Sequence, residues 1–431
     1  MSPEVLPPSA PSSPSSVRGD HPLHHLTGWK LLLFTIGPGL VVMLADTDAG
    51  SAIVAAQSGA RWGYRLLLLQ MLLVPVLYLV QELTVRLGLT TQKGHGELIA
   101  EHWGMGWAWL SVGTLLVSCL GAMLTEFAGL AGVGLLFGIP ASITIVATVV
   151  FLVVIVTTGT YRKVELVAIG LGLFELAFVA VALVARPSGP AMLGGLTQIP
   201  LGNRDYLLLV AGNVGAVIMP WMVFYQQSAV VDKGLDLSHL KASRWDTAVG
   251  AVVTQVIMAS ILILVAATIG AHRPDTPLDT VQEIAEALTP FLGSLWGRLV
   301  FALGMAGAAL VATIVVSLTA AWGLGEVTGY RHSLACHPLE APWFYAAYVA
   351  GLVVSAGVVL SGFNLVKVAV TVNVMNALLL PIVLGFLYML ARRALPAHCR
   401  LTTWESWLVG VTVLLTAGLG VYAGIVGVGA L

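Results

Sequence analysis

Charged residues are scarce in this sequence. Asp, Glu, Lys and Arg make up 10% of the 431 residues, whereas apolar residues make up 58%, and the mean hydropathy is +0.93. Soluble globular proteins carry about 25% charged residues. The composition therefore excludes a single soluble core and indicates that lipid surrounds much of the chain. Charges of the two signs nearly balance and form no long run, which predicts no nucleic-acid partner.

Cysteine and catalytic motifs are also nearly absent. The three cysteines, Cys119, Cys336 and Cys399, lack the spacing of a disulfide framework or a zinc site. The sequence has no glycine-rich phosphate loop, nucleophile elbow or paired catalytic histidine. We therefore expect no enzyme and no resident cofactor. Residues 1–27 lack the apolar segment of a signal peptide and are rich in Ser and Pro, which predicts a disordered cytoplasmic tail.

Long apolar runs predict an all-α integral membrane protein. A helix needs about 17 to 25 apolar residues to cross a bilayer. Eleven such runs lie near 31–57, 64–88, 105–135, 139–158, 163–185, 206–230, 243–271, 292–323, 342–360, 363–391 and 406–428. With the N-terminus inside, thirteen loop Lys and Arg residues lie on the cytoplasmic side and six outside, as the positive-inside rule favours. We predict a multi-pass plasma-membrane protein, C-terminus outside, that functions as a monomer.

Two spans contain interruptions that predict a transporter domain at 28–431 built from inverted repeats. We place repeat one at about 28–187, repeat two at about 204–393 and an extra helix at about 404–429. Gly50 lowers the cost of unwinding span one, and Pro220 removes a helical hydrogen bond from span six. Unwound backbone exposes carbonyl oxygens, which suit a hard cation.

Asp46 and Asp48 are the strongest candidates for a binding site. A carboxylate at the bilayer centre persists only when it is paired, hydrated or bound to an ion. Two of them at the interruption favour a cation site, although either one alone could cap the second half-helix. Met219, next to Pro220, either faces the same gap or packs in the core.

Further polar residues lie inside predicted spans. Glu126 in span three and Glu175 in span five are functional hypotheses because of their position. Asn373 and Asn376 lie on one face of span ten. They either offer amide oxygens to an ion or bond to neighbouring helices.

Several segments resemble the natural resistance-associated macrophage protein (NRAMP) family of divalent metal transporters. Residues 48–51, Asp-Ala-Gly-Ser, resemble the family's Asp-Pro-Gly-Asn segment, and residues 57–64 resemble its downstream Gln-x-Gly-Ala-x-x-Gly-Tyr pattern. Residues 215–221 resemble its span-six motif ending Met-Pro-His. The resemblance implies a LeuT-like fold, a 5+5 inverted repeat with an extra eleventh transmembrane helix, and alternating access around the broken helices.

The resemblance also implies a set of metal ligands. They are the carboxylate of Asp48, Ser51 in place of the family's Asn, the carbonyl of Ala216, the thioether of Met219, and Asn373 at a position usually held by Gln. A shorter Ser51 leaves room for the water that Mg²⁺ retains, whereas a thioether favours Mn²⁺. We expect import of Mn²⁺ and Mg²⁺, with Ca²⁺ a poorer substrate.

Departures from the family pattern bear on proton coupling. Trp221 and Gln226 replace two histidines, and Met123 replaces an acidic residue three positions before Glu126. Because these side chains do not titrate near neutral pH, we predict transport without proton coupling, as in the NRAMP-related magnesium and manganese transporters. Asp46, Glu126, Trp221 and Gln226 are candidates for the pathway or for coupling.

Alternative functions remain open at this point. One is a proton-coupled Mn²⁺ or Fe²⁺ symporter that uses Asp46, Glu126 or Glu175. An organic-solute transporter on the same scaffold is disfavoured because Asp48 would repel a substrate carboxylate. A receptor that has lost transport is disfavoured because the sequence has no long soluble domain to relay a signal.

Overall fold

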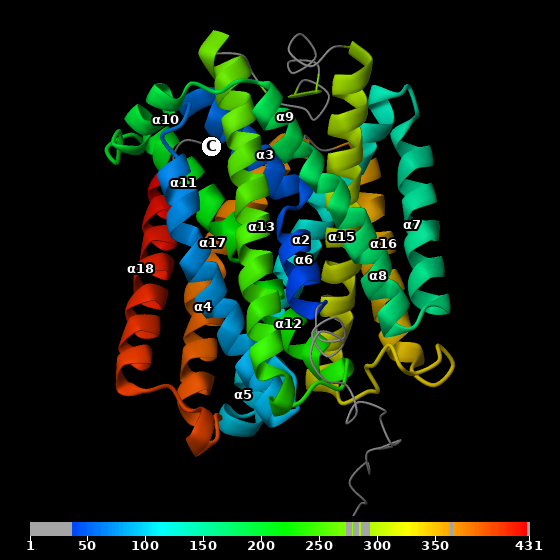
Figure 1. Cartoon of the computed structure of the whole chain (residues 1–431). Helices are drawn as coiled ribbons and strands as arrows, with labels where there is room; N and C mark the ends of the chain where they lie inside the picture. The colour runs from blue at the N-terminus through cyan, green and yellow to red at the C-terminus, as the bar shows by residue number, and fades with distance from the viewer. Residues whose placement is uncertain (1–36, 273–277, 279–283, 286–293, 363–364, 429–431) are drawn as a thin grey trace, which may run out of the picture.

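The described part of the chain is a bundle of helices (Figure 1). The computed structural model describes residues 37–272, 278, 284–285, 294–362 and 365–428. No strand occurs among these residues. The predicted N-terminal tail lies outside them.

Up to eleven candidate membrane crossings follow one another along the described part of the chain. Ten segments of the described residues are long and apolar enough to cross a bilayer, and the bent pair α2 and α3 makes an eleventh. The crossings are α2 (Pro38–Asp46) with α3 (Ala49–Trp62), α4 (Leu67–Thr91), α6 (Met105–Leu136), α7 (Ala141–Thr158), α8 (Tyr161–Gly172) with η2 (Leu173–Glu175) and α9 (Leu176–Val184), α11 (Arg204–Val217) with α12 (Pro220–Asp232), η3 (Leu237–His239) with α13 (Leu240–Val265) and η4 (Ala266–Gly270), α15 (Ser294–Thr328), α16 (Pro342–Leu360), α17 (Leu365–Arg393) and α18 (Thr403–Val428). The predicted all-α membrane fold is confirmed.

Two short helices were not predicted from the sequence. α5 (His95–Trp103) and α10 (Gly189–Leu196) are far shorter than a membrane span, so a search for long apolar runs misses them. α5 begins with a capping interaction in which the Gly94 N–H donates to Glu97 and ends at Gly104, whose φ is +93°. These helices lie at opposite ends of the bundle (Figure 1).

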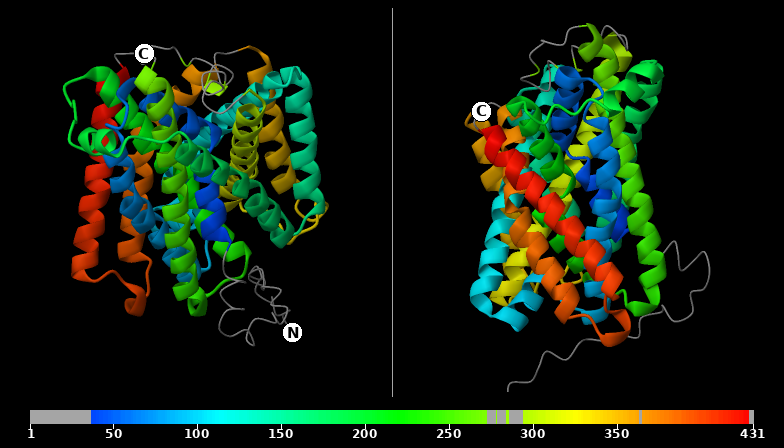
Figure 2. Two further views of the ribbon diagram at one scale, coloured as in Figure 1. Left: turned by 45° about the horizontal axis from the view of Figure 1, so that its top comes forward. Right: turned by 90° about the vertical axis from the view of Figure 1, so that its left-hand side faces the viewer.

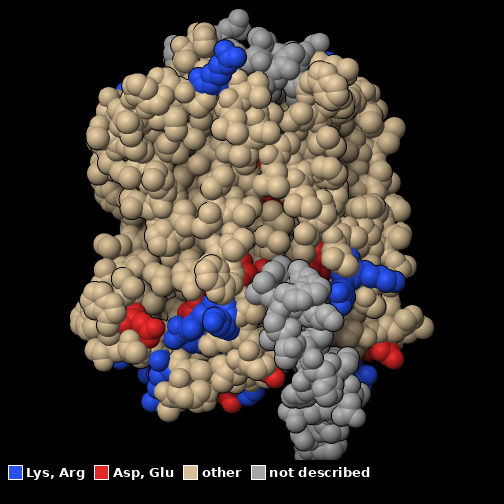
Figure 3. Space-filling model, viewed as in Figure 1, with Lys and Arg blue, Asp and Glu red and all other residues tan. Residues whose placement is uncertain are grey.

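The broken helices lie in the interior, and the apolar surface faces outward. The most apolar stretch of the α11–α12 crossing is entirely buried, whereas that of α7 is only 22% buried. On α7, the side chains of Ile143, Val146, Val150 and Val154 are more than half exposed, as expected for a surface in contact with lipid. In Figure 3 most charged side chains lie toward one end of the molecule, below a broad uncharged band.

α18 lies at the edge of the bundle. It packs against α17 and α11 (Figure 2). It follows ten other crossings and adds to the outside of the bundle, so it fits the predicted extra helix. The pair α2 and α3 lies inside, in contact with α13, α15 and α17.

Candidate metal-binding site

The break in the first crossing is formed by Thr47 and Asp48. α2 ends at Asp46, α3 begins at Ala49, and the two axes differ by 48°. Asp48 is the N-cap of α3, and its Oδ1 accepts the Ser51 N–H at 2.6 Å. The capping role considered from the sequence is therefore real. It does not exclude ion binding, since a carboxylate has about four lone-pair sites.

The break in the sixth crossing leaves the buried backbone carbonyl of Ala216 without its helical hydrogen bond. In an α-helix the carbonyl of Ala216 would accept the N–H of residue 220, but Pro220 has none. α11 ends at Val217, and Met219 is extended with φ −101° and ψ 143°. The Ala216 oxygen instead accepts the Ser51 hydroxyl at 3.2 Å. The two broken crossings therefore meet through Ser51 and Ala216.

Residues of α17 and α6 also lie at these two breaks, where they pack closely against Gly50 and Gly215. A Cβ on Gly50 would lie 3.4 Å from Asn373 Nδ2, 3.4 Å from Asp48 Oδ1 and 3.1 Å from Thr125 Oγ1. A Cβ on Gly215 would overlap the Asn373 carbonyl oxygen. Asn373 Nδ2 is buried and has no hydrogen-bond partner among the described residues. The structure thus brings Asp48, the Ser51–Ala216 contact and Asn373 together.

Met219 lies at the same break, and its sulfur has a defined partner. The indole Nε1–H of Trp221 donates to the Met219 sulfur at 3.1 Å. Both side chains are at most 1% exposed. The thioether is therefore held by an aromatic donor.

Acidic side chains surround the first break. Glu126 accepts the Ala49 N–H at 3.0 Å and the Thr125 hydroxyl at 2.9 Å. Glu175 accepts the Thr47 hydroxyl. Both carboxylate oxygens of Asp46 are buried without a hydrogen-bond partner among the described residues.

No described basic side chain pairs with these acidic groups. Asp46, Asp48, Glu126 and Glu175 belong to none of the ion pairs found in the described part of the chain. Because a buried carboxylate requires compensation, the region suits a cation or bound protons. In the same residues no group of three His, Cys, Asp or Glu side chains is arranged to hold a metal. A metal here would also need carbonyl, hydroxyl, amide or thioether ligands.

Gln226 and Asn376 lie elsewhere in the polar interior. Gln226 donates to the Thr247 hydroxyl at 2.8 Å and so links α12 to α13. Asn376 accepts the Ser118 hydroxyl at 2.8 Å, which is the interhelical bond considered from the sequence.

Thr125 was missed by sequence reasoning. Its position beside Glu126 in an apolar span was the available signal.

Comparison with known proteins identifies the family. The family model described as natural resistance-associated macrophage protein-like matches residues 39–425. The chain belongs to the NRAMP family. Members of this family are transporters and not enzymes, so that prediction is confirmed.

Two relatives are about 30% identical to this chain over the aligned residues. The divalent metal cation transporter MntH of Ralstonia nicotianae is 30% identical over 323 residues, which are 70% of this chain and 71% of that protein. MntH of Pectobacterium carotovorum is 29% identical over 302 residues, 68% of this chain and 72% of the relative.

Solved structures show the same fold. A manganese transporter of Eremococcus coleocola, solved with an aromatic bis-isothiourea compound, superposes with a TM-score of 0.75 at 20% identity, covering 92% of this chain and 87% of that one. MhsT, solved with L-phenylalanine, gives a TM-score of 0.62 at 13% identity, covering 91% and 98%. This NRAMP chain therefore has the LeuT-type fold predicted from its sequence.

Proposed function

We propose that this protein transports divalent metal cations through the region where the two broken crossings meet. The observation that carries the proposal is the buried carboxylate of Asp48, which has no basic partner among the described residues and lies beside Ser51 and Gly50. The relatives named above as divalent metal and manganese transporters support it. We propose Mn²⁺ as the principal substrate.

The proposed ligands differ in hardness. Asp48 would supply charge, and the Ala216 carbonyl and Ser51 hydroxyl would supply neutral oxygens. Asn373 presents its Nδ2 to the region, so its amide would have to turn to offer its oxygen. Met219 would supply sulfur. Oxygen ligands suit Mg²⁺ and Mn²⁺, and sulfur favours the transition metal. The hydroxyl of Ser51 now donates to Ala216, so it would have to turn for its oxygen and that carbonyl to face one ion. We propose Mg²⁺ as a second substrate because Ser51 is short enough to leave room for a retained water.

We propose that transport is not coupled to protons, as in the NRAMP-related magnesium and manganese transporters. Trp221 and Gln226 hold hydrogen bonds to Met219 and Thr247 and do not titrate near neutral pH. One observation favours a proton-coupled alternative, namely the buried Asp46 carboxylate beside the break, which has no hydrogen-bond partner among the described residues. A Mn²⁺ gradient imposed on proteoliposomes with a trapped pH dye separates the two. An internal pH change that follows Mn²⁺ entry would establish coupling.

We further propose that the protein imports metal as a monomer, with its N-terminus in the cytoplasm and the plasma membrane as its location. The repeat boundaries given above are part of this proposal. Support comes from the breaks in the first and sixth crossings, which would be the first crossings of the two proposed five-helix repeats. Rocking of one half against the other would then open the site to each side in turn.

Uptake of Mn²⁺ into proteoliposomes tests the site. Asp48→Asn keeps the size of the side chain and an oxygen that can cap α3 but removes the charge. We expect uptake to fall to the level of protein-free liposomes. Asp205→Asn, which neutralises an exposed carboxylate at the start of α11, is the matched control and should retain uptake. Uptake at the wild-type rate by Asp48→Asn would overturn the assignment.

A further inference from the structure

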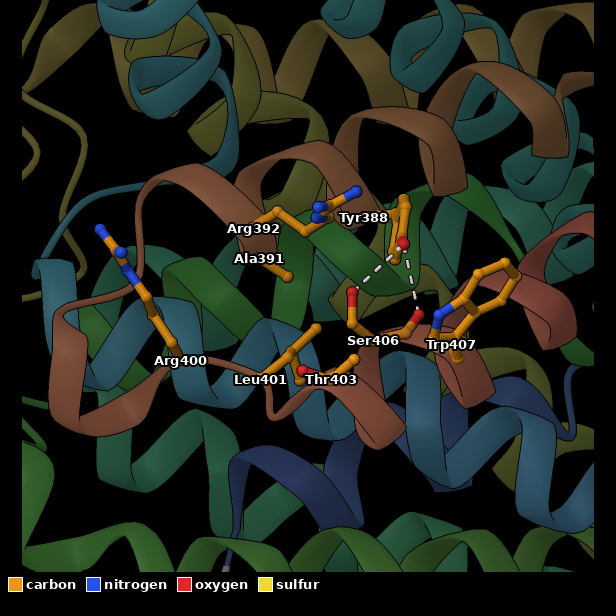
Figure 4. Close-up of a pocket in the computed structure, with 8 residues that line it drawn as sticks. All are labelled: Tyr388, Ala391, Arg392, Arg400, Leu401, Thr403, Ser406 and Trp407. Atoms are coloured by element: carbon orange, nitrogen blue, oxygen red, sulfur yellow. Dashed lines mark hydrogen bonds between the residues drawn. The ribbon is translucent and has the colours of Figure 1, made fainter.

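A cavity of about 440 Å³ lies between the end of α17 and the start of α18 (Figure 4). Its lining includes Tyr388, Arg392, Arg400, Ser406 and Trp407. None of the proposed metal ligands lines it. Its volume falls in the range of about 300 to 1,000 Å³ that is typical of small-molecule sites.

The cavity wall combines positive charge with hydroxyl groups. Among the described residues, neither Arg392 nor Arg400 has a carboxylate within ion-pair distance. The Arg400 Nε–H donates to the Leu395 carbonyl at 3.2 Å, and the Arg392 guanidinium lies 5.9 Å from the centre of the Tyr388 ring. Tyr388 also donates to the Ser406 carbonyl at 3.2 Å (Figure 4). No acidic side chain lines the cavity.

Helix termini explain only part of this charge. Arg392 and its neighbour Arg393 lie in the last turn of α17, where positive charge complements the helix dipole. Arg400 lies in the connection between α17 and α18, outside either helix. Figure 4 shows the two guanidinium groups pointing in different directions, Arg392 toward Tyr388 and Arg400 away from it, so each arginine offers its own hydrogen-bond donors to an anion.

The surroundings of the cavity are those of a membrane interface. Trp404 and Trp407, in the first turns of α18, are 73% and 69% exposed. Tryptophan is enriched where the hydrocarbon meets the headgroups. Val411, Leu414 and Leu415 continue along α18 with large exposed apolar side chains, at the three- and four-residue spacing of one helix face. A ligand with a polar head and acyl chains would fit the cavity and this face together.

We propose that the cavity binds the phosphate headgroup of an anionic phospholipid, with its acyl chains along the outer face of α18. Arginine pairs with phosphate through two parallel hydrogen bonds. Basic pockets between transmembrane helices bind such headgroups. Figure 1 shows the start of α18 at the end of the bundle where α5 also lies. The bound lipid belongs to the leaflet at that end.

Lipid binding to the full-length protein tests the proposal without any transport measurement. In neutral detergent, phosphatidylglycerol should raise the melting temperature of the wild type and appear as a bound adduct by native mass spectrometry, whereas phosphatidylcholine should do neither. The double variant Arg392→Gln/Arg400→Gln should bind phosphatidylglycerol about tenfold or more weakly. An equal effect of both lipids on the wild type would overturn the proposal.

Two further controls distinguish a specific lipid site from attraction by surface charge and from binding of a free anion. Lys163→Gln/Arg331→Gln removes the same charge from exposed positions outside the cavity and should leave binding unchanged. Inorganic phosphate should neither stabilise the protein nor compete. Equal loss in both double variants, or the same effect from phosphate alone, would overturn the lipid site. Thr403→Glu provides a second test because a carboxylate in the first turn of α18 suits the helix but repels a phosphate.

Discussion

The Trp221 indole donates to the Met219 sulfur at 3.1 Å, inside the break between α11 and α12. This hydrogen bond occupies one of the two sulfur lone pairs and withdraws electron density from the other. A thioether bonded in this way is a weaker ligand for soft metals than a free one. We therefore expect Trp221 to make the proposed site harder. Where the family resemblance implies a titratable histidine, this indole does not titrate near neutral pH.

Trp221→Phe removes this donor while keeping an aromatic ring. We expect Cd²⁺ and Mn²⁺ to bind about two- to tenfold more tightly relative to Mg²⁺, the range of a single hydrogen bond. Isothermal titration calorimetry on purified protein measures the ratio. Trp322→Phe is the control, since Trp322 is equally buried and its indole nitrogen has no partner among the described residues. An unchanged ratio in Trp221→Phe would contradict the idea.

Replacement of the sulfur itself should act in the opposite direction. Met219→Leu keeps the apolar volume and removes the soft ligand, so Mn²⁺ affinity should fall severalfold while Mg²⁺ affinity changes little. Met222→Leu, at another fully buried methionine of α12, should change neither. If both metals lose affinity equally, the thioether is not a selective ligand.

The close approach of α11 to α17 depends on Gly215. A Cβ there would overlap the backbone oxygen of Asn373, which cannot move as a side chain can. We expect Gly215→Ala to lower the free energy of unfolding by about 1 to 3 kcal/mol and to reduce Mn²⁺ uptake. Thermal denaturation in detergent measures the first effect. Gly113→Ala should be tolerated, because no described atom lies within 4 Å of the position that its methyl group would take.

His95, in α5, predicts a pH dependence of stability. Burial lowers the pKa of this imidazole to about 4, and the hydrogen bond with Gln227 only partly opposes the shift. The value for an unfolded chain is about 6.5. Between these values the unfolded chain binds a proton that the folded protein does not, so stability is complete above pH 6.5 and declines as the pH falls toward 4.

The contribution of His95 over this window is roughly 3 kcal/mol. His95→Gln should flatten the fall in melting temperature between pH 6.5 and 4 relative to the wild type, since other titrating groups are common to both proteins. His102→Gln, at an exposed histidine of the same helix, should leave the slope as it is. Identical slopes in His95→Gln and the wild type would show that folding does not lower the pKa of the His95 imidazole.

The sequence predicts the crossings and their breaks because these depend on local chemistry. Apolar length defines a span, Pro220 removes a specific hydrogen bond, and Asp48 caps the helix that comes after it. Contacts between helices could not be predicted from the sequence, because they depend on how each helix is rotated about its axis and shifted along its neighbour. The bond from Ala49 to Glu126 and the approach of Thr125 to Gly50 are examples. Gln226, a candidate for the pathway, bonds to Thr247 on α13.

The carbonyl of Ala216 has no helical hydrogen-bond donor because Pro220 has no backbone N–H. As a proposed ligand, this oxygen does not depend on the side chain of residue 216, so we expect another small residue there to leave metal binding intact. The decisive substitution would be four residues away. Pro220→Ala would allow an uninterrupted rod to form through the sixth crossing, and the oxygen would return to ordinary helical bonding. The variant would then lose metal binding because the sixth crossing had become a continuous helix.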